Sequence, residues 1–393
     1  MIAGPLIVFV SLAIWLVLLF GRGWFWLARE RDDDVLPEPE GWPAVIAVVP
    51  ARNEADGIAA CVKSLLAQDY SGPFKIVVVD DQSEDATAAV VRELGDPRVE
   101  VMAGVPHPSG WTGKLFAVSQ GVAQAGSVPV YLWLTDADIA HSADNLRHLV
   151  ARAEHGRYTL VSLMARLNCE SFAECLLIPA FVFFFDMLYP FAWVNDRRRK
   201  TAAAAGGCIL LRREALERAG GIASIRSEII DDCALGRRLK DQGPIWLGLT
   251  GRAVSLRLYP RIADIRAMVA RSAYAQLGYA PVVLAGTILG MVLLYMVPLA
   301  GLALGGLSAI FGALTWAAMT VCFQPILYFY RRSPFWGLAL PLIGVFYAAF
   351  TLDSAVQHWR GRGGMWKGRA QAIERFPKSG NRFSDKKRDN AKE

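Results

Sequence analysis

Two aspartates follow an apolar segment near the centre of the chain, in the sequence VYLWLTDADIAH from Val130 to His141. Residues 130–134 have the composition of a buried strand, and Asp136 and Asp138 come directly after it. Carboxylates two residues apart at a strand end can turn toward one point, where they offer a divalent cation oxygen ligands and leave positions open for a phosphate. Two exposed loop acids are the simpler alternative. The pair therefore predicts a metal site only if other parts of a phosphate-handling site occur along the chain.

Polar side chains also follow two other predicted strands, at residues 45–49 and 75–79. They are Pro50, Arg52 and Glu54 after the first strand and Asp80 and Asp81 after the second. The sequence GWTGK then begins a helix that carries Lys114. Because parallel strands present their carboxyl ends, and hence their ligand sites, at one edge of a sheet, we expect these loops to converge.

Predicted strands alternate with helices through this part of the chain, which indicates the α/β class. We expect a Rossmann-like, mostly parallel sheet with helices on both faces. Strands are also predicted near 162–168 and after the paired glycines Gly206 and Gly207, which permit close approach of a ligand or another chain segment. Asp231 and Asp232 begin a further helix, where favourable interaction with the helix dipole alone would account for them.

Long charge-free segments at the two ends of the chain predict membrane helices. Residues 5–20, 281–330 and 333–352 contain no charged side chain, which is enough for one, two and one crossings of a bilayer core of about 30 Å. Arg22, Arg29 and Arg31 follow the first segment, whereas no Lys or Arg precedes it. The positive-inside rule therefore places the middle of the chain in the cytoplasm, and we read the first segment as a retained anchor.

The remaining composition restricts the function classes. The six cysteines form no CxxC pairs, which is typical of buried thiols in a reducing compartment. The net charge of +6 comes largely from the tail and from residues 197–200, and beside apolar segments such groups favour anionic lipid headgroups over nucleic acid. The absence of intramembrane charges from residues 281–330 argues against a transporter. A nucleotidyltransferase would need a glycine-rich loop with a basic residue after the first strand, which is not found.

With these residues assembled, the chain resembles glycosyltransferase family 2, the inverting enzymes with the GT-A fold, from about Trp42 to Tyr279. The resemblance rests on four motifs in order. They are VVPARNE at 48–54, VVDDQSED at 78–85, TDAD at 135–138 and IDD at 230–232.

The resemblance implies roles for individual residues. Those that would bind a nucleotide sugar, with UDP as its nucleotide, are Pro50, Arg52, Glu54, Asp80, Asp81, Lys114 and Asp136. Asp138, with Asp136, would hold Mn²⁺ or Mg²⁺ at the diphosphate. Asp232, with Asp231 beside it, would be the catalytic base, so that direct displacement inverts the anomeric centre. The Q-x-x-R-W motif of processive synthases is missing, although Arg266 and Arg271 lie where it would occur, and we expect a single sugar addition.

The arrangement of membrane segments is similar to ceramide glucosyltransferases, and GRGGMWKGRAQA at 361–372 resembles the hopanoid-associated glycosyltransferases of bacteria. These resemblances imply a multi-pass protein of the bacterial inner membrane that glycosylates a lipid, with a hopanoid as one candidate acceptor. A polyprenyl-phosphate or ceramide-like acceptor is the alternative. A catalytically silent nucleotide-binding membrane protein is the alternative outside enzymes.

The predicted organisation has six parts. They are an anchor (1–28), a Pro-rich acidic linker (29–43), a cytoplasmic GT-A domain (44–262), a juxtamembrane helix (263–280), two or three membrane helices (281–357) and a basic tail (358–393). Within the domain we expect an interfacial helix at about 172–194, with an ordinary buried helix as the alternative. Three crossings after the domain would place the basic tail outside, against the positive-inside rule, so we expect one segment to be re-entrant or interfacial and the tail to be cytoplasmic.

Overall fold

A mixed eight-stranded sheet forms the middle of the chain in a computed structural model, which describes residues 3–366 and 369–370. The strand order is β3-β2-β1-β4-β7-β6-β8-β5. The bounds are β1 Val45–Ala51, β2 Phe74–Asp80, β3 Val99–Ala103, β4 Tyr131–Thr135, β5 Ile139–His141, β6 Leu160–Arg166, β7 Cys208–Arg212 and β8 Ile245–Ser255. The first four are parallel, as are β6 and β8, whereas β7 and β5 run against their neighbours. The predicted mostly parallel sheet is confirmed.

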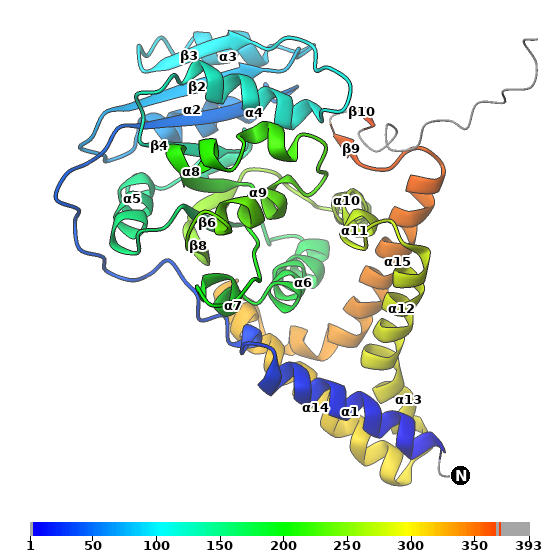
Figure 1. Ribbon diagram of the computed structural model, residues 1–393. Coiled ribbons are helices and arrows are strands. Elements are labelled where there is room, and N and C mark those ends of the chain that lie inside the picture. Colours follow the sequence, from blue (N-terminus) through cyan, green and yellow to red (C-terminus); the bar gives the residue numbers. More distant parts are fainter. Residues whose placement is uncertain (1–2, 367–368, 371–393) are drawn as a thin grey trace, which may run out of the picture.

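Helices cover both faces of this sheet, as predicted (Figure 1). On one face α2 (Ile58–Leu66) and α5 (Asn145–His155) share a core with alternate residues of β1, and on the other face α4 (Gly113–Gln124) and α9 (Asp231–Lys240) share a core with Val48. Shorter helices are α3 (Thr87–Arg92), α8 (Arg213–Arg218) and the 3₁₀ turn η2 (Ile222–Ile225). Because both sides are covered, β1 is buried along nearly its whole length.

The pairing registers explain why distant loops meet at one edge. Ala51 at the end of β1 pairs with Asp80 at the end of β2, and Thr135 at the end of β4 pairs with Cys208 at the start of antiparallel β7. In addition, Ser255 at the end of β8 pairs with Ile139 in β5. The segments that follow β1 and β4, precede β7 and follow β8 therefore lie at the same edge.

Four helices in the described part of the chain are long and apolar enough to cross a membrane, one near the N-terminus and three after the sheet. They correspond to α1 (Ala3–Gly21), α12–α13 (Pro281–Leu304), α14 (Gly306–Phe329) and η4–α15 (Pro334–Trp359). The second contains a π-helical turn, η3 (Val292–Met296), just before Pro298, whose missing N–H interrupts the regular helical bonds. In Figure 1, α1 runs beside α14, with which it packs closely. The predicted membrane helices at both ends are confirmed.

Two helices of the sheet domain pack against the membrane helices. They are α6 (Phe172–Leu188), which contacts α14 and α15, and α10 (Ile262–Ala270), which contacts α15. The Tyr347 hydroxyl of α15 donates to the Leu177 carbonyl at 2.8 Å, and the Ser354 hydroxyl donates to the Ala270 carbonyl at 2.5 Å. Most of α6 is buried, which favours the buried-helix alternative over an interfacial helix. The helix ends at Leu188, and α7 (Phe191–Asn195) begins after Pro190. The short helix α11 (Ala273–Gln276) leads into α12.

The predicted linker packs onto the sheet at its start, and residues 32–43 form neither helix nor strand. Arg31 forms a parallel bridge with Leu249 of β8. Asp32 is only 2% exposed, and ion pairs join its carboxylate to His148, Arg152 and Arg252. The local composition of Pro and acidic residues does not reveal the burial of Asp32, because all three of its partners lie more than a hundred residues away in the sequence. Much of the predicted basic tail, residues 371–393, lies outside the described residues, whereas β9 (Met365–Trp366) pairs with β10 (Arg369–Ala370).

Candidate active site

A cavity of about 420 Å³ opens at the loop edge of the sheet. It is lined by segments from the ends of β1, β4 and β8, the start of α4, the glycines before β7 and the first turn of α9. Of the residues expected from the sequence, the cavity brings together Pro50, Arg52, Glu54, Lys114, Asp136, Asp138, Asp231 and Asp232. Asp80 and Asp81 are not among its lining residues.

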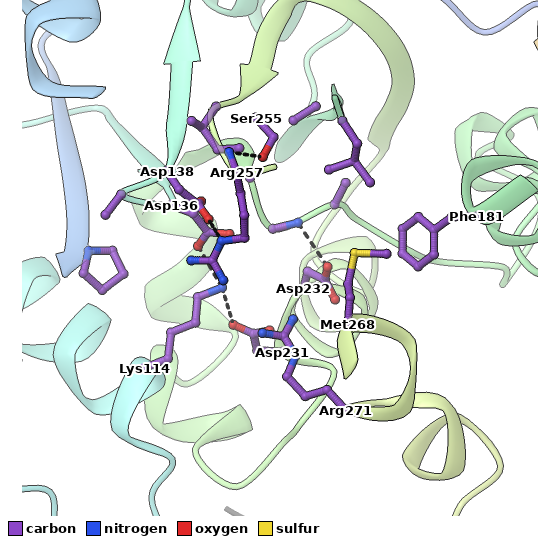
Figure 2. Close-up of a pocket in the computed structure, with 18 of the residues that line it drawn as sticks. Lys114, Asp136, Asp138, Phe181, Asp231, Asp232, Ser255, Arg257, Met268 and Arg271 are labelled. Carbon is purple, nitrogen blue, oxygen red and sulfur yellow. Dashed lines mark hydrogen bonds and ion pairs between the residues drawn. The ribbon is translucent and has the colours of Figure 1, made fainter. Parts of the chain in front are cut away.

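Lys114 links the loop after β4 to the start of α9. Its ammonium lies 2.9 Å from Oδ1 of Asp136 and 3.2 Å from Oδ2 of Asp231 (Figure 2). It is the second residue of α4, whose start is fixed by the buried Thr112, the Oγ1 of which accepts the Leu115 N–H. Burial would lower the pKa of Lys114, but the two aspartates outweigh this and raise it, so the side chain is a permanent cation in the site.

Asp232 is held by backbone amides at the start of α9. Its Oδ2 accepts the Gly206 N–H at 3.0 Å, and its Oδ1 accepts the Cys233 N–H at 2.7 Å. The paired glycines therefore approach another chain segment closely, one of the two uses that the sequence left open. Burial, followed by repulsion from Asp231, raises the pKa of Asp232 to about 6. A carboxylate with this pKa is suited to accept a proton near neutral pH.

Arg257, just beyond β8, was not predicted as a site residue. Its Nε lies 2.8 Å from Oδ2 of Asp138, and its Nη2 lies 3.1 Å from Oε1 of Glu54. It therefore connects the loop after β4 with the loop after β1. The neighbouring Tyr259 N–H donates to Glu174 at the start of α6, at 2.7 Å, which fixes the path of this segment. Only its position after a strand, in the sequence SLRLYPR, could have indicated Arg257 as a site residue. That strand, β8, was not predicted.

Asp80 and Asp81 contribute to the site through Arg52. The Arg52 guanidinium donates at 2.6 Å to the backbone carbonyls of Asp81 and Gln82. Asp81 is buried, with its N–H bonded to the Ala51 carbonyl, and the Asp80 carboxylate accepts the Ser83 N–H. The acidic loop after β2 thus supports the loop after β1 from behind the cavity.

The donor set of the cavity fits a divalent cation. Seven acidic and four basic side chains line it, and repulsion from Asp138 and Asp231 contributes, after burial, to a raised Asp136 pKa. Among the described residues no group of three or more acidic, His or Cys side chains is arranged around a single metal position. Asp136 and Asp138 would thus supply protein oxygens, and the other positions would be left to phosphate and water.

Residues 46–220 match the family described as Glycosyl transferase family 2. This part of the chain is therefore similar to family 2 glycosyltransferases. The match covers three of the four motifs noted in the sequence, and only the motif at 230–232 lies beyond its end.

Two relatives match parts of the chain. An N-acetylglucosaminyltransferase of Mesorhizobium japonicum is 41% identical over 71 residues, which are 17% of each chain. A 4,4'-diaponeurosporenoate glycosyltransferase of Staphylococcus aureus is 27% identical over 224 residues, 55% of this chain and 56% of that protein. The chain thus matches from under a fifth to just over half the length of these relatives.

A solved structure supports the GT-A-like fold of the whole chain. The mannosyltransferase PcManGT from Pyrobaculum calidifontis, determined with GDP-Man and Mn²⁺, superposes with a TM-score of 0.54 at 20% identity. The superposition covers 91% of this chain and 99% of that one. It therefore extends beyond residues 46–220 to the membrane helices.

Proposed function

We propose that the chain is a membrane-bound glycosyltransferase that moves a single sugar from a nucleotide sugar, with UDP as the nucleotide, to the hydroxyl group of a lipid. The observation that carries this proposal is the meeting of Asp136, Asp138, Lys114 and Asp232 in one cavity. These residues come from three separate segments, and each is of the type that sugar transfer from a diphosphate requires.

Asp232 is proposed as the general base. The amides of Gly206 and Cys233 hold its carboxylate, and its raised pKa keeps it basic enough to take the proton of an attacking hydroxyl. General base catalysis of this kind contributes about 10²- to 10⁴-fold. Attack from the face opposite the leaving diphosphate inverts the anomeric centre, and no nucleophile from the protein is needed.

Lys114 and the two aspartates of the loop after β4 are proposed to receive the diphosphate. Lys114 supplies a fixed positive charge toward the negative charge that develops as the sugar departs. Asp136 and Asp138 would hold Mn²⁺ or Mg²⁺, and a bound cation of this kind would provide Lewis-acid stabilisation of the leaving group. Arg257 would exchange its contact with Asp138 for the nucleotide sugar or its phosphates.

The lipid acceptor is proposed from the membrane helices and from their contacts with α6 and α10. A hopanoid is the acceptor that we favour, on the sequence resemblance of residues 361–372, of which 367–368 and 371–372 lie outside the described residues. The name of the staphylococcal relative, 4,4'-diaponeurosporenoate glycosyltransferase, is consistent with a lipid-like acceptor. We place the domain on the cytoplasmic face of the bacterial inner membrane because of Arg22, Arg29 and Arg31.

The test uses the full chain in lipid nanodiscs with radiolabelled UDP- and GDP-sugars, Mn²⁺ or Mg²⁺, and a bacterial lipid extract that contains hopanoids. We expect one labelled lipid product that carries one sugar of inverted anomeric configuration. A polyprenyl-phosphate sugar as the product would support the alternative acceptor. Nucleotide binding without transfer to any lipid would identify a silent binding protein and refute the proposal.

A further inference from the structure

The cavity has an apolar half that the chemistry of the sugar donor does not require. Six apolar side chains line it, from the end of β6, the middle of α6 and the end of α10. They are Met164, Leu167, Phe181, Phe185, Ala267 and Met268. Figure 2 shows Phe181 and Met268 on one side of Asp232, with Lys114, Asp136 and Asp138 on the other side. Asp232 therefore lies at the boundary between the charged half and the apolar half.

The apolar half borders the membrane helices. Phe181 and Phe185 are four residues apart on α6, so they lie on one face of that helix and reach the cavity. Between them on α6, Phe183 packs against Phe323 of α14 and Phe184 packs against Tyr347 of α15. Met268 belongs to α10, which also packs on α15. The two helices that supply the apolar lining beside Asp232 thus also pack directly on the helices that would lie in the bilayer.

The charges near the boundary disfavour an anionic headgroup. Two of the basic side chains of the cavity, Lys114 and Arg257, are already paired with aspartates. Within the described part of the chain, Arg271 is the one cavity base that has no acidic partner within 4 Å. Four acids line the cavity just before α9 and along α9 and α10, namely Glu228, Asp231, Asp232 and Asp264, and of these Asp231 is paired with Lys114 and Asp264 with Arg261. A phosphate placed there would face net negative charge, whereas a neutral hydroxyl would not.

We propose that the apolar wall formed by α6 and α10 holds the hydrocarbon body of the acceptor, and that the acceptor is a lipid with an uncharged, hydroxyl-bearing head. The inference rests on the proposed function and deepens it. Phe181 and Met268 contact the part of the lipid nearest the head, while Asp232 meets its hydroxyl. Water can still reach Asp232 when the apolar half is blocked, because a water molecule does not depend on contacts with the apolar side chains.

The first test separates transfer to lipid from hydrolysis of the nucleotide sugar by water. The full chain in nanodiscs is assayed for both reactions with geranylgeraniol as the acceptor, in the unaltered form and as Phe181→Trp and Met268→Trp. Because the larger Trp side chain fills part of the apolar subsite, we expect sugar transfer to geranylgeraniol to fall by about tenfold or more. We expect hydrolysis to change by less than about twofold, a difference of under about 0.4 kcal/mol. The matched control is Phe172→Trp on the same helix, where Phe172 is 71% exposed outside the cavity.

A parallel fall of transfer and hydrolysis, or unchanged transfer in both variants, would overturn the inference while leaving the proposed function in place. Absence of hydrolysis and of transfer to any lipid, geranylgeraniol and the hopanoid-containing extract included, would overturn the proposed function, and this inference with it. A measurement that does not depend on turnover uses benzoylphenylalanine at position 181, which should crosslink radiolabelled geranylgeraniol. The same group at Val105, exposed after β3, should not. Equal crosslinking at both positions would contradict a specific subsite.

The second test compares geranylgeraniol with geranylgeranyl phosphate, which share one hydrocarbon chain and differ only in the head. We expect the alcohol to be the better acceptor by about tenfold or more, as for an uncompensated charge next to acidic side chains. Preference for the phosphate, lost in Arg271→Met, would overturn the neutral-head inference and assign Arg271 to an acceptor phosphate. Both probes would bind the same apolar side chains through the same hydrocarbon chain. The result of this comparison is therefore independent of the result of the first test.

Discussion

The backbone N–H of Gly206 donates to Oδ2 of Asp232 at 3.0 Å, from a segment before β7 to the first turn of α9. A Cβ atom on Gly206 would lie 3.5 Å from both this oxygen and Nζ of Lys114. Gly206 therefore occupies the space between the proposed base and the proposed phosphate-binding cation. The reacting sugar must pass close to this backbone.

Gly206→Ala tests this relationship. Contacts of 3.5 Å are ordinary van der Waals distances, so we expect the melting temperature to change by no more than a few degrees, for a cost under about 1 kcal/mol. Sugar transfer should fall by about tenfold or more, since a 1 Å misplacement in a site can cost still more. Gly251→Ala, where an added Cβ meets nothing within 4 Å, is the control. Full activity in Gly206→Ala would mean that the sugar lies elsewhere.

The pKa of Asp232 predicts a pH dependence. Burial and then Asp231 raise this pKa from 3.8 to about 6, and a general base acts only in its ionised form. We expect kcat/KM to level off above pH 6 and to fall about tenfold for each pH unit below it. Asp231→Asn removes a negative neighbour, so the midpoint should move to lower pH. A profile that is flat between pH 5 and 8, measured with nucleotide binding followed in parallel, would argue against this base.

Lys114→Met should remove the positive charge shared by Asp136 and Asp231. We expect kcat/KM to fall by about 10²- to 10³-fold, as for other preorganised electrostatic groups, with weaker nucleotide binding. Stability should also fall, because two partly buried carboxylates lose their cation. Lys114→Arg keeps the charge and should recover part of both losses. Lys63→Met on α2, outside the cavity, provides the matched control.

Asp138→Asn should weaken binding of a divalent cation. We expect the affinity for Mn²⁺, measured by electron paramagnetic resonance in the presence of UDP, to fall by about tenfold or more. Asp264→Asn is a matched change in the same cavity, at a residue paired with Arg261 on its own helix, and should leave Mn²⁺ affinity unchanged. Equal Mn²⁺ affinities in the two variants would remove Asp138 from the metal site.

Much of the fold could be predicted because its signals are local. Polar residues end or directly follow the apolar strands β1, β2 and β4, and the charge-free membrane segments differ sharply in composition from the rest of the chain. β8 was missed because its eleven residues include two glycines and show no clear alternation of apolar and polar side chains. The burial of Asp32 was missed for a different reason, since its partners come from α5 and β8.

Site residues that directly follow strands could be predicted from the sequence. Site residues whose place depends on tertiary contacts could not. Asp136, Asp138 and Asp232 were found by spacing and resemblance, whereas Arg257 depends on its pairing with Asp138 across the sheet edge. Asp81 had the right residue type at a strand end, but its burial behind Arg52 keeps it from lining the cavity. Side-chain orientation of this kind follows from packing rather than from the order of residues.

The most direct test of the account is the activity of Asp232→Asn. The change keeps the size of the side chain and removes its basicity, so we predict that lipid glycosylation falls by at least about 10²-fold. Binding of UDP with Mn²⁺, followed by calorimetry in the same nanodiscs, should remain within about twofold of the unaltered chain, under about 0.4 kcal/mol. Turnover of Asp232→Asn within a few-fold of the unaltered chain would contradict the assignment of Asp232 as the catalytic base.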